Sequence, residues 1–96
     1  MSAMKENISV GEIVQSLAGR DKGEYFLVKS VEGEYVTIID GKKRKVDNPK
    51  RKKIKHIKKV SSVDEKFTEH ILSGKPIGNE RVAKTVKTVI QKIQED

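Results

Sequence analysis

A single stretch of 18 residues, 42–59, carries the whole excess charge of this chain. It contains 11 Lys and Arg and one acidic residue, Asp47, whereas the 96-residue chain has a formal net charge of +7. Like charges at this density repel one another unless solvent or a polyanion neutralises them. The stretch therefore indicates either a solvated basic tail or a structured basic face that binds a polyanion.

The chain has the size of one domain, or of one small domain with an appendage. Leu, Ile, Val and Phe make up 26 of the 96 residues, about 27%, which exceeds the level of roughly 20% below which disorder is expected. There is no cysteine and there are only two histidines, which argues against disulfides, a thiolate zinc site, a cysteine nucleophile and a His-rich metal site. We expect a hydrophobic core, no cofactor and no bound metal.

No apolar run has the length of a membrane-spanning helix, and residues 1–7 lack the apolar core of a secretory signal. Together with the lack of cysteine, this leads us to expect a cytoplasmic protein.

Glycines and β-branched residues predict short strands in the first half of the chain. These strands are expected at 12–17, 24–31, 34–40 and 42–46. Asp40-Gly41 predicts a two-residue turn of type I′ before the last of them, because Asp and Gly tolerate positive φ. Asn48-Pro49 ends that strand, and 54–60 is either a fifth short strand or a helical turn. The pattern is typical of a small antiparallel barrel or meander.

The last third of the chain has helical periodicity. Ser62 and Glu65 form a capping-box pattern for a first helix that ends at Gly74. Asn79 is the expected N-cap of a second helix. Its apolar stripe consists of Val82, Val86, Val89, Ile90 and Ile93. A barrel of about 60 residues is only marginally stable by itself, so we expect the helices to dock on it. Packing on each other or on a partner remains the alternative.

Few residues point to catalysis. Glu32 and Glu34 flank Gly33 in a turn, where carboxylates are usually solvated. His70 follows Glu69 on a helix and is interpreted as a surface or half-buried histidine. The glycine-rich phosphate-binding motifs of nucleotide enzymes are absent. The chain is therefore predicted not to be an enzyme.

The basic stretch points to RNA. Lys and Arg hold phosphates with little demand on sequence, and His56 is assigned equally to contact with RNA and to packing. The predicted RNA-binding residues are Arg20, Lys22, Lys42, Lys43, Arg44, Lys45, Lys50, Arg51, Lys52, Lys53, Lys55 and His56. Tyr25 and Tyr35 are the only credible base-stacking residues, whereas sequence-reading sheets need several exposed aromatics. Recognition of phosphates and shape in structured RNA is therefore expected.

The segment Val14-Gln-Ser-Leu-Ala-Gly-Arg-Asp-Lys-Gly-Glu-Tyr-Phe-Leu-Val-Lys-Ser-Val31 resembles a KOW motif, with Gly23 as the characteristic glycine. The match extends through 34–46 and Ile54-Lys-His-Ile57 and covers roughly 8–60. It resembles the archaeal and eukaryotic "fourteen-e" ribosomal proteins of the large subunit and, more closely, their small bacterial KOW-domain relatives. The resemblance implies an SH3-like barrel of about five strands that binds ribosomal RNA.

The resemblance also implies roles for the first loop. Gly19, Arg20, Asp21, Lys22 and Gly23 would face RNA together with 42–45. Gly19, Asp21 and Gly23 would shape the loop, and Asp21 would do so by hydrogen bonding its own backbone. The implied organisation is a flexible N-terminus at 1–7, a KOW barrel at 8–60 and a two-helix appendage at 61–96, for which the family suggests no role.

The leading hypothesis is a monomeric, ribosome-associated protein that binds ribosomal RNA, with ribosomal proteins as further candidate partners. The alternative is a protein-interaction module of the translation or transcription machinery, because KOW-type barrels also occur in transcription factors that contact RNA polymerase and ribosomal proteins. The contact would then be the barrel or the apolar stripe of the second helix. An exposed stripe would favour a protein partner.

Overall fold

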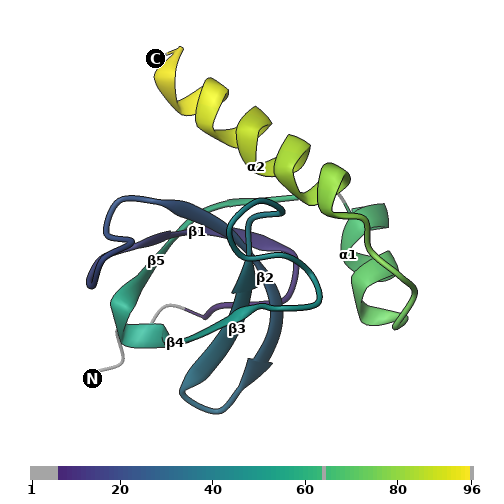
Figure 1. The fold of residues 1–96 in the computed structure, drawn as a ribbon, viewed down its shortest axis with the longest axis horizontal. Coiled ribbons are helices and arrows are strands. Elements are labelled where there is room, and N and C mark those ends of the chain that lie inside the picture. The colour runs from purple at the N-terminus through teal and green to yellow at the C-terminus, as the bar shows by residue number, and fades with distance from the viewer. Residues whose placement is uncertain (1–6, 64, 96) are drawn as a thin grey trace.

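The computed structural model describes residues 7–63 and 65–95. Its elements are β1 (Glu12–Ser16), β2 (Tyr25–Glu32), β3 (Tyr35–Ile39), β4 (Lys50–Lys53), a 3₁₀ turn (Ile54–His56), β5 (Ile57–Ser62), α1 (Glu65–Leu72) and α2 (Asn79–Gln94). The strands form one antiparallel sheet in the order β4-β3-β2-β1-β5 (Figure 1). The predicted fold, a small SH3-like antiparallel barrel followed by two helices, is confirmed. Neither helix is long and apolar enough to cross a membrane.

The sheet buries apolar side chains on both of its faces. Successive side chains of a strand point to opposite sides, and here consecutive residues are apolar. Val14, Phe26 and Val28 belong to one buried cluster, whereas their neighbours Ile13 and Leu27 belong to a second. The second cluster also contains Phe67, Ile71, Val82 and Val86 from the two helices. The helices therefore dock on the barrel and cover one face of its sheet, as expected.

The predicted strand at 42–46 is wrong. Residues 40–49 form a loop, and β4 begins only at Lys50. The Asp40 carboxylate accepts hydrogen bonds from the backbone N–H groups of Lys42 (2.8 Å) and Arg44 (2.9 Å). These local bonds occupy backbone groups that a strand would pair across the sheet. Gly41 has the expected positive φ, +79°, but it begins a long loop instead of a two-residue turn.

Both alternatives for 54–60 occur in succession. Ile54–His56 make the 3₁₀ turn, and β5 then runs from Ile57 to Ser62. Because Ser62 is still in the strand and α1 begins at Glu65, the predicted capping box does not form. The strand continues to Ser62 because Ser61 and Ser62 pair with β1, where they lie opposite Ile13 and Glu12.

Helix α2 docks through its first half and then extends beyond the barrel (Figure 1). Val82 and Val86 are buried, whereas Ile93 near the end is 41% exposed. The helix is capped by the Gly78 backbone, with no side-chain cap. The predicted N-cap Asn79 is instead the first residue of the helix, and its side chain bonds elsewhere, to the β3–β4 loop.

Candidate interaction surfaces

The basic stretch divides into cations that pair with carboxylates and cations that pair with none in the part of the chain that the structure describes. Within the described residues, ion pairs engage Lys43 with Glu24 (3.7 Å), Lys50 and Lys52 with Asp21, and Lys59 with Glu12 (3.0 Å). The others pair with no described carboxylate, and we call them the basic ridge. It consists of Lys42, Arg44, Lys45, Arg51, Lys53, Lys55 and Lys58. Its members lie on the β3–β4 loop, β4, the 3₁₀ turn and the start of β5.

Asp21 holds two of the predicted RNA-binding lysines inside the fold. Its carboxylate accepts hydrogen bonds from Lys52 Nζ (2.6 Å), Lys50 Nζ (2.7 Å) and Ser16 Oγ (2.6 Å). Lys52 is only 8% exposed and also donates to the Ala18 carbonyl at 2.7 Å. Contrary to the prediction, Lys52 is therefore not part of a surface that RNA can reach. Lys50 is half-buried in the same ion pair.

The Asp21 side chain links the β1–β2 loop to β4 instead of bonding its own backbone, as the motif had suggested. Burial by itself raises the pKa of the Asp21 carboxyl, but the hydrogen bonds from Lys50, Lys52 and Ser16 outweigh burial and hold this pKa well below its usual range. Asp21 therefore stays ionised, and its single negative charge is shared by the ammonium groups of Lys50 and Lys52. The flanking Gly19 and Gly23 have φ of +87° and +92°, as loop-shaping residues require.

Both tyrosines are partly engaged by other residues of the fold. The Arg51 guanidinium carbon lies 3.9 Å from the centroid of the Tyr35 ring, and Lys53 Nζ lies 5.8 Å from it. Tyr25 is half-buried against the cluster that the helices cover. The Arg51 guanidinium therefore already stacks on the Tyr35 ring, and the Tyr25 ring is partly taken up by the core.

The two histidines and the turn carboxylates do not come together. His56 is half-buried, and its carbonyl accepts the Leu17 N–H at 2.8 Å. His70 Nε2 lies 2.7 Å from the Pro76 carbonyl and joins α1 to the following loop. Glu32 and Glu34 are exposed in the β2–β3 turn.

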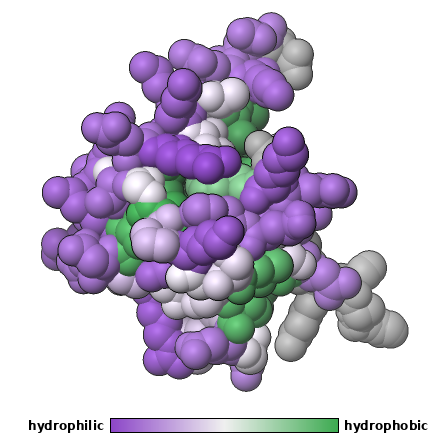
Figure 2. Space-filling view, turned by 90° about the vertical axis from the view of Figure 1, so that its right-hand side faces the viewer, coloured by the Kyte–Doolittle hydropathy of each residue, from purple (hydrophilic) through white to green (hydrophobic). Residues whose placement is uncertain are grey.

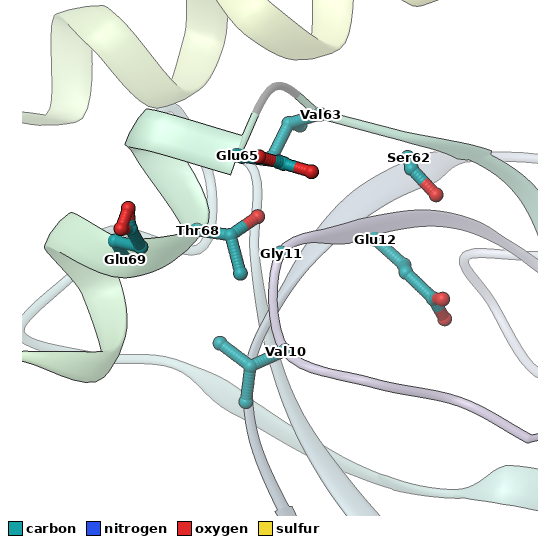
Figure 3. Close-up of a pocket in the computed structure, with 8 residues that line it drawn as sticks. All are labelled: Val10, Gly11, Glu12, Ser62, Val63, Glu65, Thr68 and Glu69. Atoms are coloured by element: carbon teal, nitrogen blue, oxygen red, sulfur yellow. The ribbon is translucent and has the colours of Figure 1, made fainter.

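An open groove of about 490 Å³ lies between the start of β1, the end of β5 and α1 (Figure 3). Its acidic residues are Glu12, Glu65 and Glu69. Their carboxylates point in different directions (Figure 3), and that of Glu12 already bonds the Ser9 N–H (2.8 Å) and Lys59. The Thr68 side chain points at Gly11, where a Cβ would collide with its hydroxyl.

The β3–β4 loop is fastened to α2. The Val46 N–H donates to Asn79 Oδ1 at 2.8 Å, and Lys29 Nζ donates to the Val46 carbonyl at 3.0 Å. A Cβ on Gly41 would collide with the Asn79 carbonyl oxygen and lie 2.8 Å from the Ala83 backbone nitrogen. The appendage therefore holds the basic loop in place, a role that the sequence did not reveal. Val46 and Asn79 lie 33 positions apart, and the sequence marks Asn79 only as a candidate helix cap.

The surface also carries separated apolar side chains. Leu72 is 66% exposed, Leu17 45% and Ile93 41%. Figure 2 shows the side of the molecule that carries α1, where apolar patches are interrupted by hydrophilic side chains. Further apolar atoms lie near the top of this view, where α2 leaves the barrel. The stripe of α2 is thus buried at one end and exposed at the other.

No protein-family model and no curated protein matches this chain. Among solved structures, it is similar to a chain in the crystal structure of the MjSpt4:Spt5 complex, conformation B, with 30% sequence identity and a TM-score of 0.57. The similarity covers 68% of this chain and 45% of the other, so this chain spans less than half of that neighbour. The match supports a KOW/SH3-like fold and does not point to a ribosomal protein.

Proposed function

We propose that this chain is a non-enzymatic KOW-type protein-interaction module of the transcription or translation machinery, acting in the cytoplasm. The observation that carries the proposal is the similarity to a chain of the MjSpt4:Spt5 complex, an assembly of two proteins. KOW-type barrels occur in proteins that bind nucleic acids and in proteins that bind other proteins. The similarity to a chain of a two-protein complex favours a protein contact. The proposal gives the chain a protein partner.

The exposed end of α2 is the contact that this proposal favours. Ile93 is 41% exposed, and Val89 and Ile90 are half-buried beside it. Lys87 and Lys92 flank this end of the helix. An apolar strip between lysines fits a partner surface with an apolar centre and an acidic rim.

A photo-crosslinking amino acid placed at Ile93 is expected to capture one recurring protein in the host cell. The tagged protein is irradiated, treated with ribonuclease, purified under denaturing conditions and identified by mass spectrometry. The matched control carries the crosslinker at Leu72, which is 66% exposed on α1. Equal and diffuse labelling from both positions, or labelling that ribonuclease abolishes, would contradict a protein contact at α2.

RNA binding is a second candidate, supported by a specific observation, the basic ridge. These side chains lie on connected elements and pair with no carboxylate in the described parts of the chain. Exposed Lys and Arg recognise the phosphate backbone without reading bases. Structured RNA, including ribosomal RNA, is the polyanion that this candidate favours.

RNA affinity is expected to fall steeply with salt if the ridge binds the backbone. With about six to eight neutralised phosphates, the slope of log K against log[salt] is about −4 to −6. Fluorescence anisotropy with a labelled RNA hairpin measures it. The Lys42→Glu, Lys45→Glu variant should weaken binding and flatten the slope, whereas Lys66→Glu, Lys75→Glu, with the same charge change near α1, should change both much less. A wild-type slope near zero would exclude this candidate.

A further inference from the structure

An open cavity of about 270 Å³ lies between the β1–β2 loop (17–24) and the β3–β4 loop (40–49), beside β4. It is lined by Arg20, Asp21, Glu24, Phe26, Lys43, Arg44 and Lys50. Most of these side chains are charged, and they come from segments far apart in the chain. The cavity is therefore a product of the tertiary fold.

The charges that line the cavity do not cancel. Asp21 is paired with Lys50 at 2.7 Å, and Glu24 is paired with Lys43 at 3.7 Å. Arg20 and Arg44 pair with no carboxylate in residues 7–63 and 65–95. Two guanidinium groups therefore remain to attract an anion.

Both arginines are carried by loops that the rest of the fold holds in place. Next to Arg20, the Asp21 carboxylate is tied to β4 through Lys50 and Lys52. The backbone N–H of Arg44 is bonded to Asp40 at 2.9 Å. Two residues later in that loop, the Val46 N–H is bonded to α2 through Asn79. A cationic site that is organised before its ligand arrives loses less conformational entropy on binding.

We propose that Arg20 and Arg44 form a notch that binds one phosphate group of an RNA backbone. The guanidinium fork matches the geometry of phosphate oxygens and makes strong charge-assisted hydrogen bonds. The cavity also adjoins the basic ridge, because Arg44 lines the cavity and belongs to the ridge. An RNA that follows the ridge therefore reaches the notch. This inference rests on the RNA-binding candidate above and assigns its central contact.

The test measures RNA binding by the whole chain and by two double variants with the same charge change. The notch variant, Arg20→Gln, Arg44→Gln, removes both guanidinium groups. The control variant, Lys66→Gln, Lys75→Gln, changes exposed residues near α1. Binding of the same labelled RNA hairpin is followed by anisotropy between about 50 and 200 mM salt. Circular dichroism verifies that each variant is folded.

The notch variant should bind about tenfold more weakly or worse, because two hydrogen bonds to a charged group are lost. Its salt slope should be shallower by about 0.7, the value for one phosphate. Arg20→Lys, Arg44→Lys should recover the slope but only part of the affinity, because it restores charge without the fork. In the control, both quantities should stay close to those of the wild type.

Three results would overturn the proposal. If the wild type binds RNA and the notch and control variants lose equally little, the notch is not a phosphate site, and RNA binding by the ridge stands. If the wild type does not bind RNA at all, the RNA-binding candidate fails and the inference fails with it. Inorganic phosphate is titrated separately, following the arginine Nε–Hε signals by NMR. Saturation by phosphate without any response to RNA would assign the notch to a small anion and overturn the RNA assignment.

Discussion

Replacing Asp21 by Asn is expected to lower the free energy of unfolding by about 3–5 kcal/mol, because it leaves the buried Lys52 ammonium without its counter-charge. Typical domains unfold with about 5–15 kcal/mol, so this single change removes a large part of the stability. Urea unfolding followed by circular dichroism measures it. Asp47→Asn is the control, because Asp47 is exposed and lies in the β3–β4 loop. Its cost should be about 0.5 kcal/mol or less.

The double variant Asp21→Asn, Lys52→Met keeps this prediction testable even if Asp21→Asn does not fold. Removing the buried ammonium together with its carboxylate replaces an unpaired charge by an apolar side chain of similar length. The double variant should therefore be more stable than Asp21→Asn alone. A double variant no more stable than the single one would contradict the role given to Lys52.

The same carboxylate predicts the acid limb of the stability curve. The pKa of Asp21 is lowered in the folded state, whereas in the unfolded chain it should be near 3.9. The unfolded state therefore takes up the proton first as the pH falls below about 5, and stability is lost on acidification. Above the unfolded pKa, the contribution is fully present. Asp21→Asn should show a shallower loss between about pH 5 and pH 2, and an unchanged acid limb would contradict the assignment.

Gly41→Ala is expected to cost about 2–4 kcal/mol, because a left-handed backbone and a backbone collision act together. Gly41 has a φ of +79°, and its Cβ would run into the Asn79 carbonyl and the Ala83 nitrogen of α2. Neither is the mobile end of a side chain, so the loop or the helix must move. Urea unfolding measures the cost, and hydrogen exchange at the Val46 amide, which bonds Asn79, reports whether the loop separates from α2.

Gly33→Ala is the matched control for this change. Gly33 also has a positive φ, +60°, but nothing lies within 4 Å of the place of its Cβ. Gly33→Ala should therefore lower the free energy of unfolding only through the left-handed backbone, by about 1–2 kcal/mol. Hydrogen exchange at the Val46 amide should stay unchanged. Equal costs at the two glycines would show that the loop does not press on α2.

The sequence predicted the elements whose own residues carry their signal. The strands near 12–17, 24–31 and 34–40 are rich in β-branched and aromatic residues, and α2 has a clear helical stripe. β4 was missed, because Lys50-Arg-Lys-Lys53 has no apolar residue to mark it. These residues form a strand because they pair with β3, where Lys52 lies opposite Val36, and because Asp21 neutralises the lysine that points inward.

The candidate interaction surface also combines properties that the sequence predicts with properties that only the fold creates. The sequence by itself determined that a dense block of positive charge must lie in this barrel and that an amphipathic helix must cover part of it, because both properties are local in composition and period. Only the tertiary structure decided which cations face solvent, since Asp21 withdraws Lys52 and Lys50 from 31 and 29 positions away. It likewise decided that α2 holds the basic loop and that Arg20 and Arg44 line one cavity. Charge pairing and close backbone contact depend on distance in space, and the linear order of residues does not record that distance.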